Sequence, residues 1–263
     1  MNGGAGRHQA AARRRHSPPA SRLDGGAPSR PTDDVTHCDA IIFDMDGVLA
    51  DTEPLHAAAV VRIMAAHGVR YVPGRADNFF GLTDDEVFGR LRARYGVQVD
   101  VRALSEQCVA EVVAAIGAGL APLPGVPHVL EALRAGGYRL ALASGSAPAV
   151  IEATLAALGI AGLFEVVVSG KEVRRGKPAP DVFLETARRL AMEPHLCLVV
   201  EDSGNGLAAA RAAGMPCVVI PCGGTLDQDF TGADGTLRSL EHLPPWLPPG
   251  PRHASGLRTH SPS

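Results

Sequence analysis

Two aspartates at the end of a short apolar run place the strongest constraint on how this chain folds. Asp44 and Asp46 follow Ala40–Phe43 directly. In an extended strand, residues two positions apart point to the same side, so both carboxylates are expected to project into one site where the strand ends. Two like charges this close resist joint ionisation unless a cation joins them or one of them carries a proton. These residues alone fit a functional site and a solvated aspartate pair in a turn before Gly47 equally well.

Short apolar runs alternate with helical patterns along the middle of the chain. Strands are predicted at Ala40–Phe43, Arg139–Ala143, Glu165–Val168, Leu196–Val200 and Cys217–Ile220. Runs that are apolar at nearly every position are typical of strands buried on both faces of a parallel sheet. Helices with 3.6-residue apolar spacing are predicted between them at 127–135, 148–158, 180–191 and 204–213. The alternation predicts an α/β fold with a Rossmann-like doubly wound parallel sheet.

One insertion interrupts this alternation after the first strand. Residues 54–121 contain no strand-like run and show three helical patterns instead, at 54–66, 84–95 and 101–116. Proline-containing segments at both ends of the insertion are typical of hinge linkers. We therefore expect an α-helical cap at 54–121, inserted into an α/β core made of residues 37–53 and 122–243.

The two ends of the chain differ in composition from its middle. Residues 1–36 carry six Arg against three Asp, and residues 244–263 carry two Arg and no acid, so the net charge of −3 hides an acidic middle. Both ends are rich in Pro or Gly and lack a periodic apolar face. We expect a disordered N-terminal extension at 1–36 and a flexible C-terminal tail at 244–263. Within this tail, local packing of Trp246 is left open.

The composition also limits the classes of molecule that the protein is expected to bind. An acidic middle without a basic stripe argues against nucleic acid as the main partner. No apolar run approaches the ~18 residues that span a bilayer, so no membrane partner is expected. Five cysteines without a C-x-x-C pair favour free thiols in a reducing compartment, which indicates the cytoplasm. Nothing in the sequence implies a protein partner.

Polar residues follow each of the other predicted strands. In an open parallel sheet, ligands bind outside the carboxyl ends of the strands. Ser144 and Gly145 follow the second strand, Lys177 follows the third between a glycine and two prolines, and Glu201 and Asp202 end the fourth. Ser144 fits both an anion site at a helix N-terminus and an ordinary helix cap. Four carboxylates beside one lysine need a divalent cation, and hard oxygen ligands indicate Mg²⁺.

Together these residues resemble the motifs of the haloacid dehalogenase superfamily of phosphotransferases. The run Asp-Met-Asp-Gly-Val-Leu at 44–49 resembles the first motif, Ser144 the second, Lys177 the third and Glu201-Asp202 the fourth. The match has the right order and spans about residues 39–225. The helical insert after the first motif resembles the cap of the phosphoglycolate phosphatase and β-phosphoglucomutase branch.

The resemblance implies a Mg²⁺-dependent phosphatase that works through an aspartyl-phosphate intermediate. Asp44 would be the nucleophile, and Asp46 would protonate the departing alkoxide and then activate the hydrolytic water. The metal would be held by the Asp44 carboxylate, the Asp46 backbone carbonyl and Asp202, with Glu201 assisting.

The same resemblance implies how the substrate is held. Ser144, Lys177 and the backbone N–H groups at Met45 and Gly145 would bind the phosphate oxygens. The substrate would be a small phosphorylated metabolite, of the sugar phosphate or phosphoglycolate type.

The cap carries only weak signals for the rest of the substrate. The candidate contacts are His56 and the segment formed by Gly81, Leu82 and Thr83. A lone histidine on a cap helix is as often structural as functional, so both interpretations of His56 stand.

Two alternatives to a phosphatase remain open. A β-phosphoglucomutase-like phosphosugar mutase resembles this chain even at His56, but that mutase carries an Arg after a Gly-x-x-Ser sequence, where this chain has Asp84 after Thr83. An acid where a second phosphate should bind disfavours the mutase. A catalytically silent binding protein would be favoured by the loss of a motif residue, and none is lost.

Overall fold

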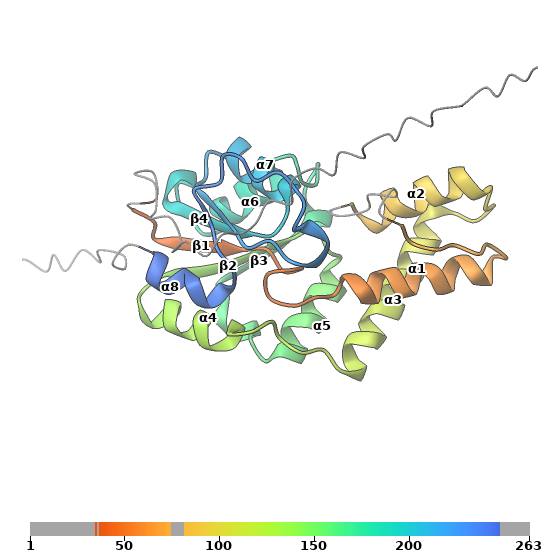
Figure 1. Ribbon diagram of the computed structural model, residues 1–263, viewed down its shortest axis with the longest axis horizontal. Coiled ribbons are helices and arrows are strands. Elements are labelled where there is room, and N and C mark those ends of the chain that lie inside the picture. Colours follow the sequence, from red (N-terminus) through yellow and green to blue (C-terminus); the bar gives the residue numbers. More distant parts are fainter. Residues whose placement is uncertain (1–34, 36, 75–81, 248–263) are drawn as a thin grey trace, which may run out of the picture.

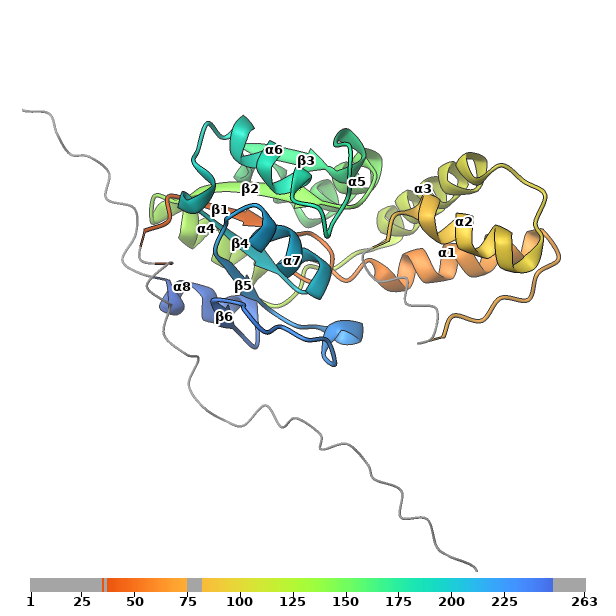
Figure 2. The same cartoon turned by 90° about the horizontal axis from the view of Figure 1, so that it is seen from above.

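A parallel sheet forms the centre of the protein, whose computed structural model describes residues 35, 37–74 and 82–247. Its strands are β1 (Ala40–Phe43), β2 (Arg139–Ser144), β3 (Val166–Ser169), β4 (Cys197–Glu201), β5 (Cys217–Val219) and β6 (Gly235–Thr236). They lie in the order β3-β2-β1-β4-β5-β6, and every neighbouring pair is parallel (Figure 2). The order reverses between β1 and β4, as in a doubly wound fold, so the crevice for a ligand is expected at the carboxyl ends of these two strands.

Helices cover both faces of the sheet (Figure 1). They are α4 (Val126–Ala135), α5 (Pro148–Leu158), α6 (Asp181–Arg189) and α7 (Gly204–Ala212). Short 3₁₀ turns complete the connections at Ala161–Leu163, Gly170–Glu172, Pro194–Leu196, Gly223–Thr225 and Leu240–His242. The Rossmann-like α/β architecture predicted from the alternating pattern is therefore confirmed.

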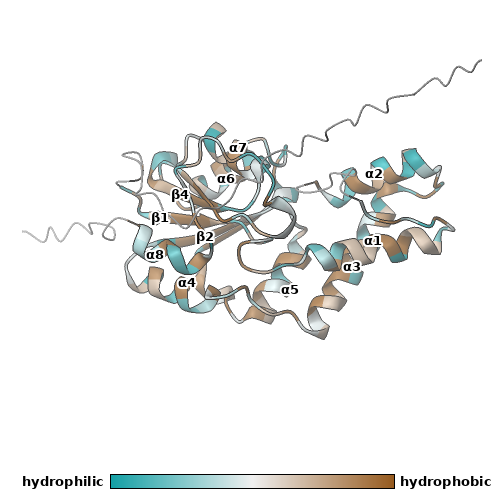
Figure 3. Ribbon diagram, viewed as in Figure 1, coloured by the Kyte–Doolittle hydropathy of each residue, from teal (hydrophilic) through white to brown (hydrophobic). Residues whose placement is uncertain are grey.

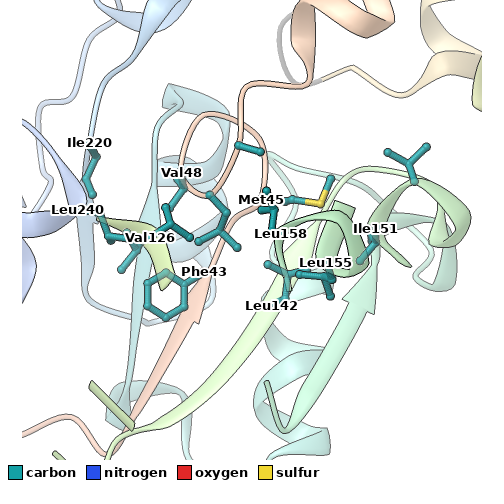
Figure 4. Close-up of a cluster of buried hydrophobic side chains, with 14 of the residues drawn as sticks. Phe43, Met45, Val48, Val126, Leu142, Ile151, Leu155, Leu158, Ile220 and Leu240 are labelled. Atoms are coloured by element: carbon teal, nitrogen blue, oxygen red, sulfur yellow. The ribbon is translucent and has the colours of Figure 1, made fainter. Parts of the chain in front are cut away.

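Alternate residues of β1 enter two different hydrophobic clusters. Ile41 and Phe43 belong to the cluster that contains α4 and α5, whereas Ala40 and Ile42 belong to the cluster that contains α6 and α7. Figure 4 shows part of the first cluster, with Phe43 and Met45 among the labelled side chains. The strands are the most hydrophobic ribbons of the molecule (Figure 3). Burial on both faces explains why β1 is apolar at every position.

Three helices lie to one side of the sheet-containing body (Figures 1 and 2). They are α1 (Glu53–Ala66), α2 (Asp84–Tyr95) and α3 (Val101–Ala118). The first two pack against α3, which also packs against α5. Thr83 caps α2 through a reciprocal pair of hydrogen bonds with Glu86, and Gly96 ends it in the left-handed region with a φ of 68°. These caps explain why the bounds of α2 agree with the helical pattern in the sequence.

The packed body extends past both of the ends predicted for it. Val35 is buried, and a last helix, α8 (Leu243–Trp246), brings Trp246 to 4% exposure. A flexible tail from Pro244 onward is therefore wrong for 244–247, because the indole buries a large apolar area against the sheet edge. The other residues of both expected extensions lie outside the described part of the chain. Within the described part, no helix combines the length and hydrophobicity needed to cross a bilayer.

Replacing Trp246 with alanine tests whether this segment stabilises the fold. The ring lies so close to Gly235 of β6 that a Cβ there would be 2.7 Å from it. We expect Trp246→Ala to lower the free energy of unfolding by about 3–5 kcal/mol, as for other large buried side chains. Urea unfolding followed by circular dichroism measures the change. The control is Val72→Ala at a 71% exposed position, and equal stability of both variants would contradict a structural role for α8.

Candidate active site

A tight loop after β1 holds the two aspartates. The loop turns at Gly47, whose φ is 76°, and the N–H of Gly47 donates to the carbonyl of Ala50 at 2.8 Å. Between the aspartates, the side chain of Met45 is fully buried in the core (Figure 4). This anchor fixes the backbone from which Asp44 and Asp46 project.

Lys177 joins the loop after β1 to the end of β4. Its Nζ donates to Asp44 Oδ1 and to Glu201 Oε1, both at 2.6 Å, and to the carbonyl of Ala143 at 3.3 Å. The three charged side chains are 9%, 10% and 1% exposed, respectively. Burial lowers the pKa of Lys177, but the charges of the two carboxylates outweigh burial and raise it above its ordinary value. The lysine therefore stays charged and holds β1 and β4 together at the switch point.

Both oxygens of Glu201 are already engaged by donors. Lys177 occupies Oε1, while Oε2 accepts from the backbone N–H groups of Asp202 and Ser203 and from Ser203 Oγ, at 2.9, 3.0 and 2.9 Å. The carboxylate lies directly over Gly206, where any Cβ would overlap it. Burial raises the pKa of Glu201, but Lys177 and these donors outweigh it, so the net shift is downward. Its environment makes Glu201 a fixed anion that orients Lys177.

Asp202 is a buried acid that has no basic hydrogen-bond partner among the described residues. It is 8% exposed, and its Oδ2 accepts hydrogen bonds from Cys222 Sγ and Thr225 Oγ1, both at 3.4 Å. Burial, followed by the charges of Glu201 and Asp44, raises its pKa to about 9. Oxygens of Asp44, Glu201 and Asp202 lie within 4.8 Å of one another. A set of oxygen donors with one uncompensated carboxylate fits a hard divalent cation.

Asp46 lies in a different environment from this cluster. Its Oδ1 accepts from Thr52 Oγ1, and its Oδ2 accepts from Ser146 Oγ at 2.9 Å. Burial raises the pKa of Asp46, with His56 and the bond from Ser146 acting in the opposite direction. The two hydroxyl partners were not predicted, although both lie within two residues of a predicted strand end or helix start. A carboxyl group whose pKa is raised and whose hydrogen-bond partners are neutral hydroxyls is suited to proton transfer.

The loop after β2 is fixed by its own serines. Ser144 is fully buried, and its Oγ accepts from the N–H of Ser146 at 3.1 Å. Ser144 does not cap α5, whose N-cap is Ala147 without a side-chain cap hydrogen bond, so the helix-cap interpretation of Ser144 is wrong. Ser169 Oγ donates to the carbonyl of Ser146 at 2.6 Å, and Gly170 approaches Gly145 so closely that a Cβ would be 3.2 Å from its Cα. The loops after β2 and β3 thus close together beside Lys177, whose third bond goes to Ala143.

The comparisons with known proteins agree with this geometry. The sequence model of the haloacid dehalogenase-like hydrolase family matches residues 41–220. The chain belongs to the haloacid dehalogenase-like hydrolase family. This hydrolase is 36% identical to protein CbbY of Rhodobacter capsulatus over 213 residues, which are 76% of this chain and 93% of that one. It is 35% identical to the Escherichia coli fructose-1-phosphate phosphatase YqaB, over 68% of this chain and 94% of that one.

A solved structure shows the same relationship. A crystal structure of a CbbY variant from Rhodobacter sphaeroides in complex with xylulose 1,5-bisphosphate aligns with a TM-score of 0.72 and 30% identity. The alignment covers 77% of this hydrolase and 95% of that chain. The likeness therefore includes the helical insert as well as the sheet.

Of the four residues named from the sequence for the helical insert, His56, Leu82 and Thr83 lie in the described part of the chain. His56 is in the first turn of α1, and its Nδ1 is 3.3 Å from Asp84 Oδ1 at the start of α2. Burial opposes the charged imidazole, but Asp84 and then Asp46 outweigh it and raise the pKa of His56. Thr83 is the N-cap of α2, Leu82 packs against the core cluster, and Gly81 lies outside the described residues.

An ion pair connects α2 to the turn that follows β3. Lys171, in the 3₁₀ turn after β3, lies 2.6 Å from Asp85 in the first turn of α2. The signal in the sequence was limited to an acidic helix start, which pointed to no particular partner. The start of α2 is therefore held next to the loop that follows β3.

Without added divalent cations, the stability of the hydrolase should fall as the pH rises. Between the ordinary pKa of 3.8 and about 9, the folded chain keeps a proton on Asp202 that the unfolded chain releases. The folded state then binds more protons, so the free energy of unfolding decreases with pH over this interval. Urea unfolding in chelator at several pH values measures the slope.

The matched variant for this measurement is Asp202→Asn, which removes the Asp202 titration and should make the slope less steep, while Asp44 and Glu53, whose pKa values are raised to about 7, continue to contribute. Asp100→Asn, at an exposed helix cap, should leave it as in the wild type. An unchanged slope in Asp202→Asn would contradict the assignment of the uncompensated charge to Asp202.

Proposed function

We propose that this hydrolase is a Mg²⁺-dependent phosphatase that removes the phosphate group from a small phosphorylated sugar through an aspartyl phosphate on Asp44. The observation that carries the proposal is the arrangement at the switch point, where Lys177 fixes Asp44 and Glu201 while Asp202 is left without a basic partner. A buried nucleophile, a fixed cation and an uncompensated carboxylate are what transfer of a phosphoryl group requires.

In the first step, Asp44 attacks the phosphorus atom and the bond from phosphorus to the sugar oxygen breaks. Lys177 holds Oδ1 of Asp44, which leaves Oδ2 for the attack. Asp46 gives its proton to the departing alkoxide, and burial, which raises the pKa of Asp46, favours the protonated form needed for this step. The hydroxyls of Thr52 and Ser146 then stabilise the carboxylate that forms.

In the second step, Asp46 takes a proton from water, the water oxygen attacks the aspartyl phosphate, and the bond from phosphorus to Asp44 breaks. Phosphate leaves and Asp44 is regenerated. Lys177, Ser144 and the backbone N–H groups at Met45 and Gly145 are the proposed contacts of the phosphate oxygens. General acid–base catalysis of the kind proposed for Asp46 typically increases the reaction rate by ~10²–10⁴-fold.

Mg²⁺ would be held by the carboxylates of Asp44 and Asp202 and by the backbone carbonyl of Asp46. When bound, it supplies positive charge that screens the carboxylate from the phosphate and stabilises charge in the transition state. Glu201 assists by orienting Lys177, because both of its oxygens are engaged. The oxygen-only donor set favours Mg²⁺ over softer ions.

Phosphorylated sugars are the proposed substrate class. One relative is named a fructose-1-phosphate phosphatase, and another is solved with xylulose 1,5-bisphosphate. We assign residues 54–121 as a cap domain over a core of 37–53 and 122–243, with Lys171 and Asp85 linking the two. Asp84 at the start of α2 favours a substrate with hydroxyl groups, since a second phosphate would meet its negative charge. Five free cysteines support a cytoplasmic location.

Replacing Asp44 with asparagine tests the mechanism. Asparagine keeps the shape but removes the nucleophilic carboxylate, so release of phosphate from fructose 1-phosphate in Mg²⁺ should fall by about 10⁴-fold or more. A phosphate-release assay measures the rate, and circular dichroism checks the fold. Asp100→Asn, on the cap surface, is the control and should keep full activity. Turnover by Asp44→Asn near the wild-type rate would refute the proposed nucleophile, and full wild-type activity in chelator would refute the metal.

Product analysis separates hydrolysis from mutase chemistry. Incubated with β-glucose 1-phosphate and its bisphosphate activator, a phosphatase releases inorganic phosphate, whereas a mutase forms glucose 6-phosphate. We expect free phosphate as the main product, because Asp84 repels the second phosphate that a mutase must hold. Formation of glucose 6-phosphate as the main product would reverse this assignment.

A further inference from the structure

A second group of metal-ligating side chains lies among the cap helices, outside the carboxylate cluster. His56 belongs to α1, Asp84 to α2 and Cys108 to α3. One ligand atom of each lies within 4.8 Å of the other two. His56 Nδ1 is 3.3 Å from Asp84 Oδ1, and Cys108 Sγ is 3.8 Å from the same oxygen. Three helices therefore each supply one ligand to a single point.

The group is open to solvent on one side and closed on the other. The side chains of His56 and Asp84 are 23% and 14% exposed, whereas Cys108 is fully buried in the apolar face of α3. Both α1 and α2 pack directly against α3, so the ligands are held by helices instead of loops. An ion arriving from solvent would meet the imidazole and the carboxylate first, with the thiol beneath them.

The charges around the group favour a cation. After burial, the charges of Asp84 and Glu111 are the main causes that raise the pKa of Cys108. Two basic residues near the cluster are already paired, Arg62 with Glu111 at 2.8 Å and Lys171 with Asp85 at 2.6 Å. A divalent ion would bind the carboxylate of Asp84 together with the imidazole of His56, which is its ion-pair partner in the structure.

We propose that His56, Asp84 and Cys108 form a binding site for Zn²⁺ that is separate from the Mg²⁺ site. Imidazole nitrogen, thiolate sulfur and carboxylate oxygen are the ligands that Zn²⁺ uses, whereas Mg²⁺ prefers oxygen alone. On binding, the thiol proton and any proton on Nδ1 pass to solvent. Three protein ligands leave a fourth position for water.

Binding at this site has a consequence for the cap and for Asp46. The ion would cross-link the first turns of α1 and α2 to the middle of α3. It would also hold the ring of His56 as a neutral ligand, and His56 is the group whose charge acts most strongly on Asp46. The site itself depends only on the cap geometry, so it stands whether or not the proposed phosphatase reaction is correct.

Cobalt is the spectroscopic probe for this site. Co²⁺ added to the full chain should give a thiolate-to-cobalt charge-transfer band in the near ultraviolet, and Zn²⁺ should abolish the band by displacement. Cys108→Ala and the closely sized Cys108→Ser should both lose the band. Isothermal titration calorimetry should show that both variants bind Zn²⁺ at least about tenfold more weakly than the wild type. Loss of a residue that only orients a metal ligand already lowers metal affinity by about that factor, so loss of a ligand should lower it at least as much.

The matched control is Cys222→Ala, because Cys222 is the cysteine that contacts Asp202 in the carboxylate cluster. This variant should keep the cobalt band. A band that is lost in Cys222→Ala and kept in Cys108→Ala would place the ion in the carboxylate cluster and overturn the proposal. The absence of any band in the wild-type chain, with native circular dichroism, would overturn it as well.

Discussion

The buried ion pairs of Lys177 are the interaction on which the rest of the site depends. One ammonium group bonds to a carboxylate at the end of β1 and to another at the end of β4, each at 2.6 Å. Removing a charge from water costs several kcal/mol, so such a lysine is stable only while both carboxylates remain in place. The sheet supplies that condition, because β1 and β4 are neighbours at the point where the strand order reverses. The fold and the site are thus held by the same contact.

Charge balance explains the other features around this contact. Three acids lie within one cluster, and the single lysine satisfies two of them, so Asp202 is left uncompensated. The site is also sterically crowded. A Cβ at Gly206 would overlap Glu201, and a Cβ at Gly47 would collide with Asp202. Glycine is needed at both positions because the backbone must approach the carboxylates closely.

The sequence predicted those parts of the molecule that follow from local pattern and strand order. Runs of buried apolar residues located β1 to β5, and the rule that ligands bind at the carboxyl ends of parallel strands brought Asp44, Lys177 and Asp202 to one edge. What escaped depends on contacts between distant segments. Strand β6 has two residues and no pattern of its own, and the sequence did not identify Gly235 as the place where Trp246, considered for local docking, packs its ring. Ser146 escaped as a partner of Asp46 for the same reason, since its bond to Asp46 spans 100 positions.

The two aspartates of the first loop lie on one backbone segment but in two different electrostatic environments. Asp44 is held by a permanent cation, whereas Asp46 is held by two neutral hydroxyls and lies in the field of His56, a group on the cap. Lys177 favours the ionised carboxylate of Asp44, although burial outweighs it and raises the pKa of Asp44 to about 7. The neutral donors at Asp46 leave its carboxyl group free to gain or lose a proton. Because His56 is paired with Asp84 at the start of α2, the charge that acts on Asp46 from α1 is itself linked to α2. In the proposed mechanism, the residues at the strand ends would carry the reaction, and His56 would influence the acid, Asp46.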